Sequence, residues 1–242
     1  MVEDQNFHKV KKIIYVLILL LVFSSKSYSQ NFKLEKLVKL DAPWGSSFIN
    51  DREIIVTEKS GKIKIVNILS KEIKEISHQL NFVVHGQGGL LDIISEGNTI
   101  WITCSIQKQK LLTTAIFKSR LENNTLIDTQ LIFEALPYIL NAKHFGSRMA
   151  IQGDFLFASV GERGKGMIAQ DPSNSVGSII RIHKDGSIPN DNPYIDNSDW
   201  LPEIFQIGVR NPQGMSLDPL TGDVYISNHG PKGGDFIGPI LK

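Results

Sequence analysis

The residues best suited to chemistry are a histidine and a glutamate at the ends of two strand-like runs. His144 lies just before one run, and Glu162 follows the next one. If the two runs pair as a hairpin, both side chains meet at the same edge of the sheet. A histidine titrates near neutral pH and can act as a general base, and a neighbouring carboxylate can fix its tautomer. A solvated or capping role is the alternative for a histidine in isolation.

Glycine-rich and turn-forming loops contain further residues that could bind a ligand or an ion. Gln87 lies in a Gly-Gln-Gly-Gly loop, where backbone can approach a ligand because no Cβ intervenes; a tight turn is the alternative. Arg210, followed by Asn211, can grip a carboxylate in bidentate fashion. Gly230 and Pro231 can offer backbone carbonyls to a hard cation such as Ca²⁺.

The elements that must position these residues are short strands. The pattern predicts strands at residues 53–57, 63–66, 99–105, 155–160 and 224–227. Short antiparallel strands without helices predict an all-β fold. A similar unit recurs roughly every 45–65 residues, around Ser47, Asp92, Met149 and Met215, which favours about four blades of a β-propeller. A β-sandwich is the alternative.

Composition narrows the class of protein. The chain has 242 residues, of which 41% are hydrophobic and 21% charged, as in ordinary globular domains. Basic and acidic residues nearly balance, so nothing indicates binding to nucleic acid or to an anionic membrane. Cys104 is the only cysteine, which excludes an intrachain disulfide, and its apolar surroundings predict a core position.

The N-terminus predicts export. Lysines precede an apolar run at residues 13–23, and small residues then suit cleavage before Gln30, so residues 1–29 form a predicted signal peptide. An uncleaved anchor is the alternative. We therefore expect a periplasmic or secreted protein, without a membrane segment after cleavage. The β-propeller domain is expected over residues 30–242 and, lacking a clear closing strand after Asp235, to be incomplete at its C-terminus.

These motifs, in this order, resemble the soluble PQQ-dependent aldose sugar dehydrogenases of the glucose/sorbosone dehydrogenase family. The resemblance is carried by residues 43–45, 57–61, 86–91, 144–148, 185–193, 210–214 and 229–235. It implies a six-bladed β-propeller with PQQ and Ca²⁺ bound on one face. It also implies an aldose sugar as substrate, a lactone as product and an external electron acceptor.

The resemblance also implies roles for individual residues. His144 matches the base that takes a proton from the anomeric hydroxyl while hydride passes to PQQ. Glu162 stands where the family has an orienting aspartate, which keeps the charge but adds one methylene. The remaining matches are Gln87, Arg210 and Asn211 for the cofactor, and the carbonyls of Gly230 and Pro231 for Ca²⁺. A non-catalytic secreted propeller that binds a glycan or a protein is the alternative, and a Ca²⁺-dependent lactonase is a third reading.

Overall fold

The computed structural model describes residues 32–241. Within this part, the chain forms four antiparallel sheets and one short 3₁₀ helix, η1 (Gly166–Gln170). The all-β class predicted from the sequence is confirmed. The predicted signal peptide, residues 1–29, lies outside the described residues. No helix among residues 32–241 is long and apolar enough to cross a membrane.

The first two sheets, here blades 1 and 2, each contain four strands. Blade 1 consists of β1 (Pro43–Asn50), β2 (Glu53–Glu58), β3 (Ile63–Asn67) and β4 (Ile73–Ile76). Blade 2 consists of β5 (Leu90–Glu96), β6 (Thr99–Lys108), β7 (Leu111–Glu122) and β8 (Thr125–Glu134).

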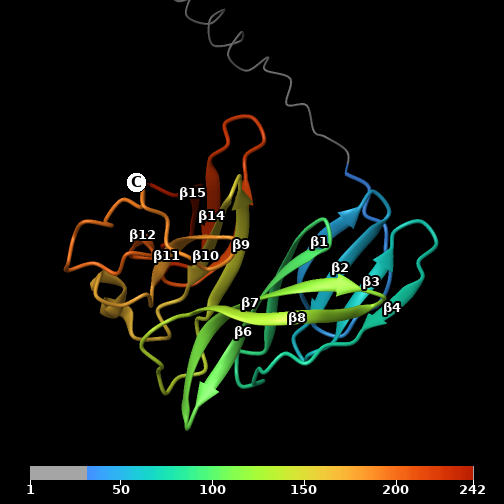
Figure 1. The fold of residues 1–242 in the computed structure, drawn as a ribbon, viewed down its shortest axis with the longest axis horizontal. Helices are drawn as coiled ribbons and strands as arrows, with labels where there is room; N and C mark the ends of the chain where they lie inside the picture. Colours follow the sequence, from blue (N-terminus) through green and yellow to red (C-terminus); the bar gives the residue numbers. More distant parts are fainter. Residues whose placement is uncertain (1–31, 242) are drawn as a thin grey trace, which may run out of the picture. The chain divides into compact units, whose positions relative to one another are not determined.

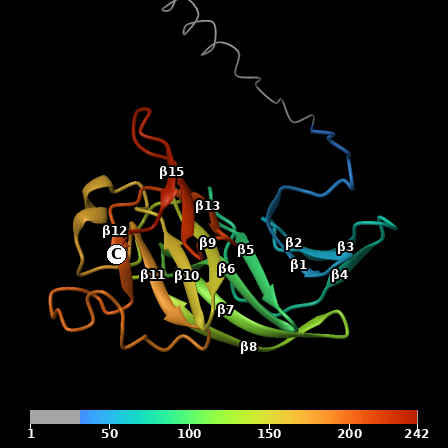
Figure 2. The ribbon, with the colours of Figure 1, turned by 90° about the horizontal axis from the view of Figure 1, so that it is seen from above.

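The next two sheets are blades 3 and 4. Blade 3 consists of β9 (Gly146–Gln152), β10 (Phe155–Val160), β11 (Ser178–His183) and β12 (Ile204–Ile207). Blade 4 has three strands, β13 (Pro212–Leu217), β14 (Val224–Asn228) and β15 (Phe236–Pro239). Figures 1 and 2 show the blades following one another from blue to red along the chain.

Each blade is an up-and-down meander whose first strand lies at one edge. These first strands touch one another in order, β1 with β5, β5 with β9, and β9 with β13. Sheets that meet through their first strands in this way are successive blades of a β-propeller. The recurring unit noted in the sequence falls on the four innermost strands, since Ser47, Asp92, Met149 and Met215 belong to β1, β5, β9 and β13.

Apolar clusters between neighbouring blades form the core. On β6, Ile100 and Ile102 pack towards blade 1, whereas Trp101 packs towards blade 3. On β10, Leu156 packs towards blade 2 and Phe157 towards blade 4. Successive side chains of a strand point to opposite faces, so a blade covered on both sides needs apolar residues at nearly every position.

The predicted strands at residues 53–57 and 63–66 pair as a hairpin, and the predicted core position of Cys104 is confirmed. β2 and β3 pair across the turn at residues 59–62, which closes through a 2.7 Å hydrogen bond from Glu58 N to Lys62 O. Cys104 lies on β6 and is fully buried. Burial raises the pKa of its thiol to about 12, so the thiol stays protonated and unreactive at neutral pH.

A buried carboxylate on β5 binds β9 and lies close against β1. Asp92, on β5, accepts hydrogen bonds from Met149 N at 2.9 Å and from Arg148 Nη1 at 3.1 Å, both on β9. A Cβ at Gly45, on β1, would lie 2.6 Å from Asp92 Oδ1, so only glycine allows this approach. Burial raises the pKa of Asp92, while Arg148 and the Met149 N–H act in the opposite direction.

Asp92→Ala should therefore destabilise the propeller. It removes both acceptors and leaves a buried N–H and a partly buried guanidinium unpaired, which should lower the free energy of unfolding by about 2–4 kcal/mol. Urea unfolding followed by tryptophan fluorescence measures the loss. Glu75→Ala is the control, because Glu75 forms an exposed ion pair with Lys62 that should contribute below about 1 kcal/mol. Equal midpoints for the two variants would contradict the bridging role of Asp92.

Candidate active site

The structure brings His144 and Glu162 together. β9 pairs with β10 in a register that sets Gly146 opposite Val160, and the two residues lie just beyond this pair. His144 Nδ1 is hydrogen-bonded to Glu162 Oε1. The two side chains are 12% and 4% exposed, so the pair is largely shielded from water. The meeting of these residues at one sheet edge, predicted from the sequence, is confirmed.

The surroundings of Glu162 favour its ionised form. Burial raises the pKa of the carboxyl, but hydrogen bonds from Gly166 N, at 2.5 Å to Oε2, and from His144 outweigh burial, and the net pKa is lowered. An ionised carboxylate only accepts hydrogen bonds, so Nδ1 of His144 carries the proton. In the neutral imidazole, Nε2 then holds the free lone pair.

The backbone that carries His144 is strained and held from several sides. In the His144 loop, residues 144–147, three residues have φ between 52° and 84°, a region that side chains disfavour. Gln87 Oε1 accepts the His144 N–H at 2.7 Å. Thr103 and Thr114 each donate a 2.8 Å hydrogen bond to a carbonyl of the loop. Blade 2 therefore fixes the conformation of a loop that belongs to blade 3.

Arg210 and Asn211 lie against the same loop. Glu162 N donates to Arg210 O at 2.8 Å, and Gly146 N donates to Asn211 Oδ1 at 3.1 Å. Asn228 Oδ1 accepts the N–H groups of both Arg210 and Asn211, at 3.1 and 3.0 Å. The three loops predicted to carry His144, Glu162 and the Arg-Asn pair are thus one hydrogen-bonded network.

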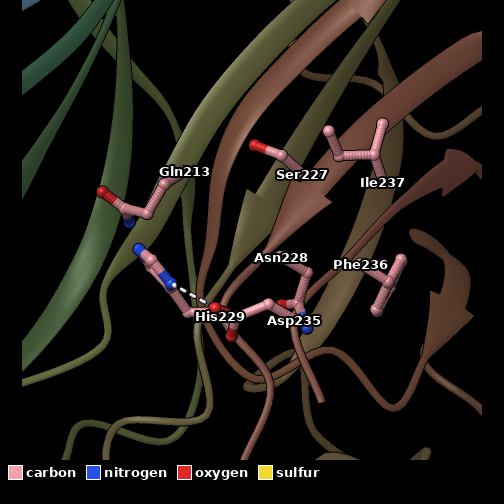
Figure 3. A pocket seen from close by; sticks show the side chains of 7 residues that line it. All are labelled: Gln213, Ser227, Asn228, His229, Asp235, Phe236 and Ile237. Atoms are coloured by element: carbon pink, nitrogen blue, oxygen red, sulfur yellow. Dashed lines mark ion pairs between the residues drawn. The ribbon is translucent and has the colours of Figure 1, made fainter. Parts of the chain in front are cut away.

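Two adjoining cavities open beside this network. The first, of about 180 Å³, is lined by Trp44, Gln87, Phe145, Gly146, Asn211, Gln213 and His229. The second, of about 430 Å³, shares Gln213 and His229 and is lined further by blade 4 (Figure 3). Figure 3 also shows the His229 imidazole between Gln213 and Asp235. When protonated, His229 Nδ1 forms an ion pair with Asp235 Oδ2 at 3.7 Å.

The two residues predicted to hold Ca²⁺ are not among the lining residues of either cavity. Gly230 N donates to Asp235 Oδ1 at 2.9 Å, and Pro231 O accepts Gly234 N at 3.0 Å, so both belong to a tight turn after His229. No group of three or more His, Cys, Asp or Glu within residues 32–241 is placed to hold a metal ion. Calcium binding through these carbonyls stays a prediction.

Sequence reasoning missed several residues of the site. Gln213 and His229 stand inside motifs that were recognised, but only the cavity shows that their side chains line it. Trp44 lines the same cavity, and its buried Nε1–H has no hydrogen-bond partner among the described residues. Asn228 directly follows the predicted strand at residues 224–227 and ends β14, and nothing in its local sequence indicates that it caps Arg210 and Asn211.

Fold and site together define a class: β-propellers with a buried histidine–carboxylate pair beside a cavity rich in amide side chains. The comparison with known families is specific. A family model described as Glucose / Sorbosone dehydrogenase matches residues 40–242. The chain belongs to this family.

Individual relatives support the same family. The chain is 32% identical to aldose sugar dehydrogenase YliI of Escherichia coli over 82% of the chain and 56% of that protein. The crystal structure of the Escherichia coli enzyme in its apo-form superposes with a TM-score of 0.79 at 31% identity, over 84% of the chain and 61% of the enzyme.

The names of one further relative and of one solved structure with the same fold refer to a quinone. Quinoprotein glucose dehydrogenase B of Acinetobacter calcoaceticus is 26% identical over 90% of the chain and 52% of that protein. The PQQ-bound aldose sugar dehydrogenase of Streptomyces coelicolor has the same fold, with a TM-score of 0.73 at 22% identity, covering 86% of this chain and 62% of that one. The chain spans about half the length of the curated relatives it matches.

Glu162→Gln should reduce stability in a pH-dependent way. The folded pKa is lowered from the ordinary 4.5, so the carboxylate stabilises the fold above that pH and loses this contribution as the pH falls through the lowered value. We expect a loss of about 1–2 kcal/mol at pH 7 that shrinks as the pH falls through the lowered pKa of Glu162. Urea unfolding over a series of pH values below 7 measures it, with the exposed Glu72→Gln as control. A loss that grows as the pH falls would rule out the ionised pair.

Proposed function

We propose that the chain belongs to a PQQ-dependent aldose sugar dehydrogenase and carries its general base. The observation that supports this most directly is the shielded hydrogen bond between His144 Nδ1 and an ionised Glu162. This arrangement leaves Nε2 as the basic nitrogen. In this role, Nε2 accepts the proton of the anomeric hydroxyl as the C1–H bond of the aldose loses hydride and the lactone forms.

Glu162 is the orienting group in this proposal. Its Oε1 holds the imidazole in the tautomer with the proton on Nδ1, and it stabilises the imidazolium that forms when Nε2 takes a proton. The Gly166 N–H keeps the other carboxylate oxygen engaged. The exchange of aspartate for glutamate is accommodated, since the longer side chain still reaches Nδ1.

The donor groups at the smaller cavity support binding of an anionic cofactor that accepts hydrogen bonds. Gln87, Asn211 and Gln213 line the smaller cavity with amide groups, and the unpaired Trp44 Nε1–H adds a donor. The Arg210 guanidinium lies next to this network, donating to His229 O at 3.3 Å, and can also pair with a carboxylate. PQQ, when bound, supplies a quinone that accepts the hydride. Together the cavities reach the size of small-molecule sites.

Calcium is part of the proposal through the carbonyls of Gly230 and Pro231. Backbone oxygens are ligands that Ca²⁺ prefers. Each carbonyl has two lone pairs, so the turn bond from Gly234 N to Pro231 O leaves one lone pair available. Two carbonyls fill only part of a calcium shell, and the other ligands would come from the cofactor and water.

The predicted signal peptide supports a periplasmic or secreted location, where an aldose and an external electron acceptor would be the partners. Fractionation of cells that express the full chain, together with N-terminal sequencing of the exported product, tests this. Recovery of the uncleaved chain in the membrane fraction would support the anchor instead. Cleavage before Gln30 is the expected result.

His144→Ala should abolish turnover and leave PQQ binding nearly unchanged. Loss of a general base costs about 10²–10⁴-fold in rate, while the cavity residues stay in place. Dye-linked oxidation of a panel of aldoses, with a Ca²⁺-dependent PQQ titration in parallel, measures both. His183→Gln is the matched control, because His183 lies on β11 at the end remote from the His144 loop. Unchanged turnover in His144→Ala would refute the assignment, and a folded protein that binds no PQQ would favour the non-catalytic alternative.

Arg210→Ala should weaken PQQ binding. A charge-assisted hydrogen bond contributes about 1.5–3 kcal/mol, which corresponds to a roughly 10- to 100-fold higher Kd. Fluorescence titration with PQQ at saturating Ca²⁺ measures it. Arg120→Ala is the control, since Arg120 pairs with Glu122 and Asp128 on an exposed hairpin. Equal affinities in the two variants would exclude a contact between Arg210 and the cofactor.

A further inference from the structure

The residue after Glu162 is a fully buried arginine. Arg163 has no exposed surface and is among the largest side chains buried to this degree. Within residues 32–241, it forms no ion pair with a carboxylate. Burial lowers the pKa of its guanidinium to about 10, with Glu162 acting in the opposite direction, so the group remains charged at neutral pH. Burying a cation is costly unless hydrogen bonds compensate.

The guanidinium of Arg163 donates to three backbone carbonyls, two of which lie just ahead of His144. Nε donates to Lys143 O at 3.0 Å, Nη2 donates to Asn141 O, and Nη1 donates to Leu112 O of β7 at 2.8 Å. Its Cζ lies 3.7 Å from the centroid of the Phe145 ring, the residue just after His144. One side chain thus contacts the segment on both sides of His144 and connects it to blade 2.

The backbone around Arg163 is shaped for this grip. A Cβ at Gly161 would lie 2.1 Å from His144 O, and a Cβ at Gly164 would lie 2.6 Å from the Asn141 side chain. Arg163 N also donates to His144 O at 3.3 Å. The two glycines allow the stretch 161–164 to lie directly against the chain that carries His144.

The hydrogen bonds of Arg163 indicate that it positions the backbone around His144. An apolar side chain would fill the same volume without a buried charge. A planar fork that donates in fixed directions is suited to setting the relative positions of several carbonyls. Two of the carbonyls that its side chain binds, those of Asn141 and Lys143, lie directly ahead of the strained loop at residues 144–147, whose conformation the local sequence does not favour.

We propose that Arg163 is a positioning residue that holds His144 within reach of Glu162. Glu162 orients the imidazole ring, and Arg163 holds the backbone beneath it. The functional meaning of this role rests on the proposed function, in which His144 is the base. The geometric role can be tested in the protein without cofactor, so the two can fail separately.

The test follows His144 by NMR in ¹⁵N-labelled protein without PQQ. The readouts are the downfield Nδ1–H resonance of the bond to Glu162 and the hydrogen exchange of the His144 amide. Wild type should show the resonance, and Glu162→Gln and His144→Ala identify it by its loss or shift. Arg163→Met should lose the resonance and exchange the amide at least about tenfold faster. Arg163→Lys, which keeps the charge but not the fork, should show a smaller change in the same direction.

Arg181→Met is the matched control. Arg181 is also buried, but it binds Asp191 and Asn192 on the outer part of blade 3. This variant should lose stability and keep both His144 signals, which separates positioning from a general loss of stability.

In PQQ-loaded protein, Arg163→Lys should lower kcat at least about tenfold with KM and the Kd for PQQ changed less than threefold, whereas Arg181→Met keeps the wild-type kcat. Wild-type His144 signals in Arg163→Lys would overturn the proposal, whether or not Arg163→Met folds. Altered signals in Arg181→Met as large as those in Arg163→Lys would also overturn it. Altered signals confined to the Arg163 variants would support the positioning role even in a protein that binds no PQQ, and only the proposed function would then fail.

Discussion

The close approach between the His144 loop and the end of β10 is the constraint on which the site depends. Gly161 makes it possible, because any Cβ there would collide with the carbonyl of His144. The approach sets Glu162 beside the imidazole and gives Arg163 access to the carbonyls ahead of it. The left-handed conformation of His144 persists because these contacts outweigh its intrinsic cost.

The propeller surrounds the His144 loop with hydrogen-bond partners that a single sheet would not provide. The His144 loop begins blade 3, yet its hydrogen-bond partners come from both neighbours: Gln87 precedes the first strand of blade 2, and Asn211 precedes that of blade 4. Apolar clusters between blades 2 and 3 and between blades 3 and 4 hold these loops at fixed separations. Such preorganisation is what a general base and its orienting group require.

The parts of this structure that the sequence predicted follow local rules. Turn residues mark the strand ends, the inner strands repeat, and one hairpin suffices to bring His144 to Glu162. The missed residues, Trp44 and Asn228 among them, act through bonds or cavities formed with distant segments, which leave no period or spacing in the sequence. For the same reason, the Gly230–Pro231 turn could be recognised as a motif but not located relative to the cavity.

Glu162 and Arg163, adjacent residues of opposite charge, together fix the position of the His144 imidazole. The carboxylate acts on the ring of His144, and the guanidinium acts on the backbone that carries the ring. Their charges also stabilise each other, because Glu162 opposes the effect of burial on the pKa of Arg163. A carboxylate alone would orient an imidazole whose backbone could still move, and an arginine alone would hold a ring free to rotate. Both Glu162 and Arg163 are needed to place the imidazole, because the strained loop by itself fixes neither the position nor the tautomer of His144.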